Sequence, residues 1–263
     1  MIDTAAIQKR ITPANARPMW LKAIIYGKSG VGKTVLLATK KAGKRTLIVD
    51  VEDGTLSIAG ADVDVVRITF GEDPDSQADA FAQMQAIFTM LKADAGKKYD
   101  LLAIDSLTQA QKFVLSGTIR EKIKQREAKS LWKASLEDQG IMTEKMRHML
   151  WDLRSLPMHI VYTCLSQDVL PEGEVQTYET LALTPKFRDN VLAYSDVVAR
   201  LDITKARDKS GNVVENVRRL SLQSDGSFAA KVRTPLGKTV PAYILQPTLD
   251  KLISAFRGEE ETK

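Results

Sequence analysis

The stretch GKSGVGKT, residues 27–34, limits what this chain can fold into more than any other part of its sequence. It fits the pattern G-x-x-x-x-G-K-[ST], whose glycines let the backbone turn its N–H groups inward around phosphate groups. A short apolar run, residues 21–26, comes directly before it, and a stretch with helical character, residues 33–42, ends before Gly43. Strand, loop and helix thus occur in the order that this motif requires, with the helix N-terminus facing the phosphates. We therefore predict a phosphate-binding loop.

The loop motif assigns roles to particular residues. Lys33 is expected to reach the β- and γ-phosphates of ATP, and the Thr34 hydroxyl is expected to bind Mg²⁺. The residues predicted to contact the nucleotide are Gly27, Lys28, Ser29, Gly30, Val31, Gly32, Lys33, Thr34 and Val35. ATP and Mg²⁺ are therefore the expected ligands of this loop.

Composition limits the class of protein. The chain has 263 residues, of which 44% are hydrophobic and 27% charged, which is enough for one large α/β domain with a core. A single cysteine, Cys164, excludes an internal disulfide and suggests a reducing cytoplasm. No apolar run has transmembrane length and no signal peptide is recognisable, so we expect a cytoplasmic protein without membrane contact. The net charge of +5 is compatible with a polyanionic partner.

Apolar strands alternate with helical stretches along the first two thirds of the chain. The strands that we predict cover residues 21–26, 45–51, 63–69, 99–105 and 158–165. Residues 77–98 form an amphipathic helix in this prediction, and residues 106–156 are mostly helical. This alternation indicates a mostly parallel sheet with helices on both faces. After residue 195 we expect an antiparallel strand meander, with turns at the sequences SGN and SDGS.

The predicted domain limits follow from the same pattern. Residues 1–20 are polar with two prolines and are expected to form an N-terminal arm. Residues 21–257 are expected to form the ATPase domain, and residues 258–263 an acidic, disordered tail.

Two predicted strands end in carboxylates. The run 99–105 ends in Asp105, the arrangement in which a strand brings a carboxylate to the Mg²⁺ side of a phosphate loop, and Ser106 is a candidate to hold a water or the metal. The run 45–51 is followed by Glu52 and Asp53 and contains Asp50. ATP hydrolysis needs a group that orients and deprotonates a water, and Glu52 is our candidate for this base. Asp50 and Asp53 are alternatively turn residues, and Glu52 alternatively a surface acid.

Together, the loop and the two strand ends resemble the RecA-type ATPase core. In that superfamily the catalytic glutamate sits in a strand end of the form apolar-apolar-Asp-x-Glu, which IVDVE matches at Glu52, and AIDS resembles its Walker B segment. The sequence AAKVRTPLG is similar to the Lys-x-Arg strand end of RecA-fold replicative helicases. That resemblance implies that Lys231 and Arg233 reach across a subunit interface to a neighbour's γ-phosphate. Alternatively, they are outward-facing cations that protect an edge strand.

More narrowly, the chain from WLKAIIYGKSGVGKT to LTPKFRDNVLAYSDVVARL resembles short phage nucleotide-binding proteins. These are RecA-like recombinases reduced to the ATPase core and associated with single-strand annealing. The resemblance implies a phage- or prophage-encoded ATPase in the bacterial cytoplasm that binds single-stranded DNA and self-associates into a filament or ring. It further implies annealing or strand exchange beside a single-strand-binding protein. A ring helicase or helicase loader, and a nucleotide-switched partition or scaffold ATPase, are the alternatives.

Lys28 raises the partition alternative. In ATPases of the ParA/MinD type, a lysine at this position reaches the phosphates of a partner. Here Ser29 follows instead of glycine, and VEDG follows the second strand instead of that family's Asp-x-Asp-Pro. We therefore interpret Lys28 as an ordinary variable position of the loop.

Two basic segments are candidates for DNA contact, because the RecA fold binds DNA through loops after the Walker B strand and after the next strand. Segment 111–133 carries many cations, with Phe113 and Trp132 nearby for stacked bases, and its acids have no partner at i,i+4. Segment 166–190 looks long and flexible, and Thr163 and Gln167, near the end of the predicted strand 158–165, are candidates to sense the γ-phosphate. A solvated helix face is the alternative for the first segment. The cations predicted to contact DNA are Lys112, Arg120, Lys122, Lys124, Arg126, Lys129, Lys133, Lys186 and Arg188.

Overall fold

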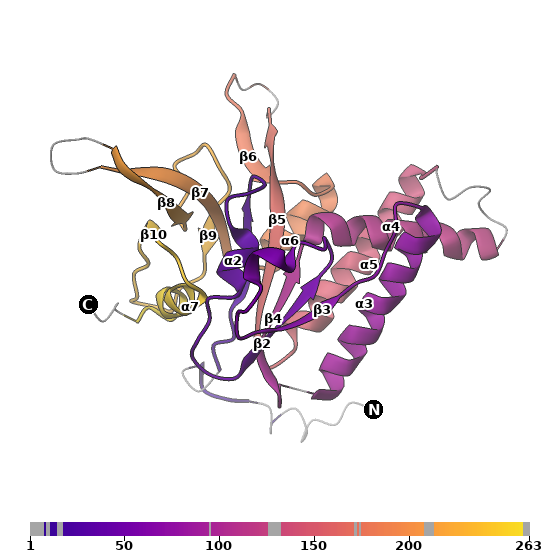
Figure 1. The fold of residues 1–263 in the computed structure, drawn as a ribbon, viewed down its shortest axis with the longest axis horizontal. Coiled ribbons are helices and arrows are strands. Elements are labelled where there is room, and N and C mark those ends of the chain that lie inside the picture. Colours follow the sequence, from indigo (N-terminus) through magenta and orange to yellow (C-terminus); the bar gives the residue numbers. More distant parts are fainter. Residues whose placement is uncertain are drawn as a thin grey trace.

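The structure is a computed structural model that describes residues 8, 11–14, 18–94, 96–125, 133–170, 173, 175–207 and 213–259, without the side chains of residues 206, 207, 213 and 214 (Figure 1). Most of the predicted arm and tail lies outside these residues. Among the described residues, ten strands form one sheet. The main path of the sheet runs in the order β10, β8, β7, β1, β5, β4, β2, β3.

Six strands of this sheet are parallel to one another, as the alternation of strands and helices predicts. They are β3 (Asp64–Arg67), β2 (Arg45–Asp50), β4 (Tyr99–Asp105), β5 (His159–Val169), β1 (Lys22–Gly27) and β7 (Val197–Arg207). Every residue of β1 is buried, because helices cover both faces of a parallel sheet. The predicted α/β architecture, a mostly parallel sheet flanked by helices, is confirmed.

The remaining strands are antiparallel to their neighbours. The strand β8 (Val213–Ser221) pairs with β7, and β10 (Tyr243–Leu245) pairs with β8. Two short strands lie off the main path, since β6 (Tyr178–Leu181) pairs with β5 and β9 (Lys231–Val232) pairs with β7. The C-terminal segment is therefore antiparallel as predicted. However, SFAAKVRTP contributes a short strand to β7, and the neighbour of β8 is the unpredicted β10.

Helices pack against both faces of the sheet and bury two apolar layers. One face carries α3 (Pro74–Asp94), α4 (Leu107–Lys124), α5 (Leu136–Arg154) and α6 (Pro185–Tyr194). The other carries α2 (Lys33–Leu37), the 3₁₀ turn η2 (Thr55–Ile58) and α7 (Leu249–Arg257). In β1 the side chains alternate between the two layers: Ile24 packs in the first, and Ile25 packs with Leu36 and Leu37 in the second.

The helix after the phosphate loop is shorter than predicted, since α2 ends at Leu37. Two contacts turn the chain away beyond this point. The Thr39 hydroxyl accepts the backbone N–H of Leu249 at 2.9 Å, and the Lys40 ammonium pairs with Asp100 at 2.7 Å. Helix propensity favoured continuation to Gly43, but these tertiary contacts override it.

Segment 166–190, predicted to be a long flexible connection, is largely regular. Strand β5 continues to Val169 and forms an antiparallel pair with β6, and α6 then begins at Pro185, a residue favoured in the first turn of a helix. The sequence did not predict the pairing of β5 with β6, because a partly exposed hairpin contains many polar residues and needs no continuous apolar run.

Candidate nucleotide-binding site

The phosphate loop follows β1 and is shaped by glycines where the sequence predicted them. Gly30 and Gly32 have φ angles of +80° and +96°, which side chains disfavour. At Gly27 the constraint is space, since a Cβ there would lie 2.2 Å from the Leu201 carbonyl oxygen of β7. The loop is thus pressed against β7 and leaves its N–H groups for a ligand.

Lys33 lies at the start of α2, with its side chain drawn back over the loop. Its Nζ donates to the carbonyl oxygens of Gly27 and Lys28, both at 2.9 Å. Burial lowers the pKa of Lys33, while the nearby charges of Asp105 and Glu52 oppose the change. The ammonium is therefore held at the loop beside both predicted carboxylates.

Thr34 and Asp105 lie together, as the motif predicts. The Thr34 hydroxyl donates to Asp105 Oδ2 at 2.6 Å, and the Thr163 hydroxyl of β5 donates to Asp105 Oδ1. Strand β5 lies between the loop strand β1 and the carboxylate strand β4, so it is well placed to fix Asp105. Thr163 thus orients this carboxylate, and its role in sensing the γ-phosphate stays a prediction.

The adjacent hydroxyl and carboxylate suit Mg²⁺, which prefers oxygen ligands and keeps several waters. Thr34 and Asp105 would hold the ion, whose charge stabilises the phosphate oxygens when it is bound. Among the described residues, this site included, there is no cluster of three or more His, Cys, Asp and Glu side chains suited to a metal. Water and phosphate oxygens would complete the coordination.

Glu52 reaches the same site from the neighbouring strand. In the pairing of β2 with β4, Asp50 lies opposite Asp105, so Glu52 follows β2 beside the end of β4. The Ser106 hydroxyl donates to Glu52 Oε1. The predicted base, the predicted Mg²⁺ ligand and Lys33 therefore come together at the carboxyl ends of parallel strands, where ligands bind in open α/β sheets.

Asp50 and Asp53 serve the turn after β2, the alternative considered for them. Buried Asp50 accepts the N–H groups of Glu52 at 3.1 Å and Gly54 at 3.2 Å, and the Thr55 hydroxyl at 2.8 Å. Asp53 has a left-handed backbone, with φ of 54°, and its exposed side chain lies 3.5 Å from Arg67.

A family model described as an AAA domain matches residues 19–234, more than half of the chain. The chain belongs to the AAA domain family. It thus carries an AAA-type P-loop ATPase domain, and the match includes the loop, Glu52 and Asp105. None of the curated proteins compared with the chain matches it. Among the described residues of this AAA domain protein, no helix is long and apolar enough to cross a membrane.

The two predicted trans-acting cations contact the carboxyl end of α6 and not the loop of their own AAA domain. Strand β9 pairs Lys231 with Val198 near the start of β7, whereas the loop follows the end of β1, which runs parallel to β7. Lys231 Nζ donates to the Leu192 carbonyl, and Arg233 Nη2 to the Ala193 carbonyl at 2.7 Å. Their action on a neighbouring subunit remains a prediction.

The cations predicted to bind DNA divide into two groups. Arg120 pairs with Asp79 at 2.5 Å, and Lys122 pairs with Asp138 at 2.9 Å and Glu137 at 3.1 Å. These acidic partners lie on α3 and α5, outside segment 111–133, so neighbouring helices rather than the segment itself neutralise the two cations. Arg188 lies 3.9 Å from Asp189. Four of the predicted DNA-contacting cations are exposed and have no ion pair to another described residue: Lys112, Lys124, Lys133 and Lys186. Arg126 and Lys129 lie outside the described residues, as does Trp132.

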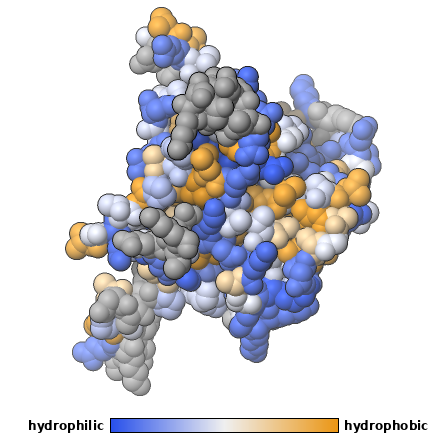
Figure 2. All heavy atoms as spheres, turned by 60° about the vertical axis from the view of Figure 1, so that its left-hand side comes forward, coloured by the Kyte–Doolittle hydropathy of each residue, from blue (hydrophilic) through white to orange (hydrophobic). Residues whose placement is uncertain are grey.

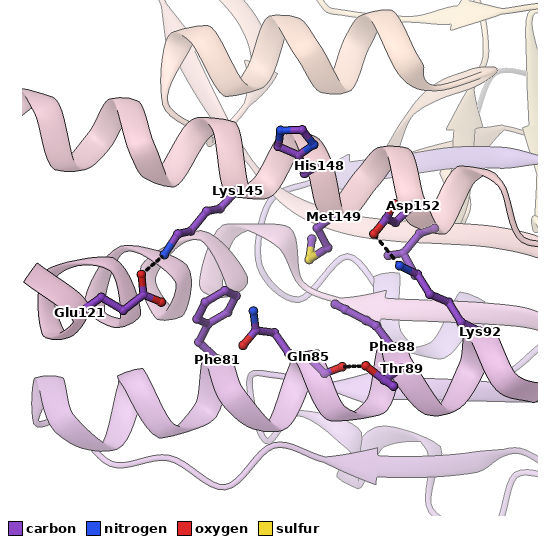
Figure 3. Close-up of a pocket in the computed structure, with 11 residues that line it drawn as sticks. Phe81, Gln85, Phe88, Thr89, Lys92, Glu121, Lys145, His148, Met149 and Asp152 are labelled. Carbon is purple, nitrogen blue, oxygen red and sulfur yellow. Dashed lines mark hydrogen bonds and ion pairs between the residues drawn. The ribbon is translucent and has the colours of Figure 1, made fainter. Parts of the chain in front are cut away.

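The helical layer of the AAA domain contains a cavity that is separate from the loop. It has a volume of about 430 Å³ and lies between α3, α4 and α5 (Figure 3). Phe81, Phe88 and Met149 supply apolar walls, and Lys145 pairs with Glu121 at 2.6 Å at one end. All its lining residues belong to these three helices, and none of them is a predicted nucleotide-binding residue.

Sequence reasoning missed one residue at the loop. The Arg218 side chain of β8 donates from Nε to the Val31 carbonyl at 3.1 Å. Arg218 belongs to no motif, and 187 positions separate it from Val31, so only the fold brings the two together.

Proposed function

We propose that this AAA domain hydrolyses Mg·ATP with Glu52 as the base, and that hydrolysis is coupled to single-stranded DNA. The observation that supports the hydrolysis most directly is the convergence of Lys33, Thr34, Asp105 and Glu52 at the ends of β1, β4 and β2. Each residue supplies a function that phosphoryl transfer requires.

In the proposed mechanism, the loop amides and Lys33 bind the phosphates, and Thr34 and Asp105 hold Mg²⁺. Glu52 orients a water and accepts its proton as the water oxygen attacks the γ-phosphorus, and the bond from this phosphorus to the bridging oxygen breaks, which releases ADP. Ser106 holds the Glu52 carboxylate by a hydrogen bond, which directs it toward the site. Positioned charges and hydrogen-bond donors contribute most of the acceleration in reactions of this class.

The DNA coupling rests on charge and on the resemblance to RecA-like proteins. The chain carries a net charge of +5, and Lys112 and Lys124 on α4 and Lys186 on α6 are exposed. Such cations bind nucleic-acid phosphates and release counterions. With self-association into a filament or ring, this ATPase would promote annealing or strand exchange, beside a single-strand-binding protein.

The steady-state ATPase rate, with and without long single-stranded DNA at low and moderate salt, tests this proposal. We expect DNA to stimulate the wild-type rate, and the stimulation to weaken as salt rises. Glu52→Gln should hydrolyse little ATP under either condition. An ATPase rate that does not change when DNA is added would overturn the proposed coupling of hydrolysis to DNA. Efficient unwinding of forked DNA would instead identify a helicase.

A further inference from the structure

The loop is held from the side opposite to its catalytic groups. Asp105 ends β4 and Glu52 follows β2, both on one side of β1, whereas β7 and β8 lie on the other side. Arg218 lies on β8, opposite Ile203 of β7, and contacts the Val31 carbonyl. A Cβ at Gly32 would lie 2.3 Å from Arg218 Nε, so the guanidinium lies directly against the loop.

Arg218 differs from the other arginines of the β7–β8 hairpin in its charge environment. Arg200 pairs with Glu179 at 2.6 Å, and Arg219 pairs with Asp202 at 2.7 Å. Arg218 is exposed and has no ion pair to another described residue. A guanidinium has five N–H donors, and only Nε has a partner among the described residues, the Val31 carbonyl.

This arrangement exceeds what a structural contact needs. A neutral side chain would serve equally well to hold one carbonyl, whereas a phosphate chain needs positive charge and favours the arginine fork. Given the proposed function, the γ-phosphate lies towards Asp105 and Glu52. The nucleoside end of the bound nucleotide then extends towards β7 and β8.

We propose that Arg218 binds the α-phosphate of the nucleotide held by its own subunit. It is a binding residue, because the γ-phosphate and the attacking water lie on the other side of β1. Arg218 would therefore strengthen the binding of ATP and of ADP to a similar degree. A cation acting on the transferred phosphate would instead strengthen the binding of ATP alone and raise the rate of hydrolysis.

Equilibrium binding of a fluorescent ADP and a fluorescent non-hydrolysable ATP analogue tests this proposal. We expect Arg218→Ala to weaken both by roughly tenfold or more, as for loss of a hydrogen bond to a charged group. Arg218→Lys should restore part of the affinity. The matched control is Arg219→Ala, which removes the next arginine in the sequence and should leave both affinities unchanged.

Kinetics then separate binding from catalysis. We expect Arg218→Ala to raise KM for ATP with little change in kcat, as for loss of uniform binding. Unchanged affinity for ADP would overturn the proposal, whether or not kcat falls. The ADP measurement needs neither hydrolysis nor DNA, so it tests Arg218 even if the proposed reaction or its DNA coupling fails.

Discussion

At the scale of single residues, the candidate site depends on a carboxylate that approaches from a neighbouring strand. Glu52→Gln keeps the size and loses the base, so we expect kcat to fall about 10²–10⁴-fold. The affinity of Glu52→Gln for nucleotide should equal that of the wild-type protein. Steady-state hydrolysis and nucleotide binding measure the two effects. Asp53→Asn is the matched control, because Asp53 is an exposed carboxylate of the same turn. Wild-type hydrolysis by Glu52→Gln would show that another group activates the water.

Ser106 allows a test of positioning. Its hydroxyl donates to Glu52, and the residue is 1% exposed. We expect Ser106→Ala to lower kcat roughly tenfold, a typical cost of losing a hydrogen bond to a charged group. Affinity for ADP should not change, because Ser106 has no role in binding phosphate. A rise in the ADP dissociation constant with normal kcat would show that the hydrogen bond has no catalytic role.

The sequence predicted the site residues that belong to motifs, but not the contacts that depend on tertiary structure. Lys33, Thr34, Asp105 and Glu52 lie in the loop or at strand ends, where local pattern determines position. In contrast, Thr163 contacts Asp105 because β5 lies between β1 and β4, and strand order cannot be derived from local pattern.

At the scale of secondary-structure elements, His159 joins two strands. It begins β5, and its buried Nδ1 accepts the backbone N–H of Leu21 at 3.0 Å, just before β1. Its ring packs edge-on against Trp20. Burial, reinforced by the charge of Arg257, lowers the pKa of His159 from 6.5 to about 4. Neutral His159 is therefore part of the folded structure.

This pKa shift predicts sensitivity to acid. Between pH 6.5 and about 4 the unfolded chain protonates His159 and the folded chain does not, so the stabilisation is complete above about pH 6.5 and is lost as the pH falls. The loss amounts to at most about 3 kcal/mol. Denaturant unfolding from about pH 7 to 4.5 measures it. His159→Gln should show a shallower dependence than wild type, and exposed His148→Gln should match wild type. Equal slopes for all three proteins would contradict this.

Helices α4 and α5 are joined by a cation that the sequence assigned to DNA. Lys122 pairs with Asp138, which also completes a capping box with Ser135 at the start of α5. Although burial opposes ionisation, Lys122 and Ser135 hold the pKa of Asp138 below its usual value. We expect Lys122→Ala to lower the thermal unfolding midpoint by a few degrees, because a buried carboxylate loses its partner. An unchanged midpoint would show that this pair contributes little.

Exposed cations without ion pairs give the cleaner test of DNA contact. We expect Lys112→Ala and Lys124→Ala to weaken binding of single-stranded DNA and to reduce its salt dependence, by a slope of about 0.7 per lost phosphate contact. Thermal stability should not change, because neither residue has an ion pair to another described residue. Fluorescence anisotropy over a range of salt concentrations measures the slope. An unchanged slope in both variants would place the DNA elsewhere.

The sequence predicted the buried elements better than those near the surface. Strands β1, β2, β4 and β5 appear as apolar runs because both faces of the sheet are covered. Strand β10, of three residues, and β6 have little apolar signal, because their place depends on a neighbouring strand. The end of α2 is decided by Thr39 and Lys40, whose partners are distant in sequence.

At the scale of the whole molecule, the loop follows the end of β1, whereas Arg233 lies near the start of β1, because its N–H donates to the Asp196 carbonyl and the Asp196 N–H donates to the Lys22 carbonyl. A head-to-tail assembly would bring the Lys231–Arg233 pair of one subunit to the loop of the next subunit. We expect Glu52→Gln and Arg233→Ala each to be nearly inactive alone and to recover activity when mixed. Some interfaces then combine a wild-type Glu52 with a wild-type Arg233. The ATPase rate of the mixture measures this recovery.

Thermal unfolding controls for the structural role of Arg233, which donates to the carboxyl end of α6. A mixture no more active than its components, or normal activity of Arg233→Ala alone, would contradict the trans-acting role.

Figure 2 shows one face of the molecule, on which hydrophilic residues predominate around smaller hydrophobic areas. A largely hydrophilic surface is compatible with contacts that form and dissolve with nucleotide.

The two outer strands of the main sheet have a consequence for how the protein behaves in concentrated solution. One edge is β3, of four residues, where Asp64 pairs with Arg45 at 2.7 Å and with Lys98 at 3.2 Å. The other is β10, of three residues. Short edges and edge charges prevent sheets from joining edge to edge. Crowded molecules should therefore resist growth into insoluble fibres, and turbidity after prolonged storage should stay low.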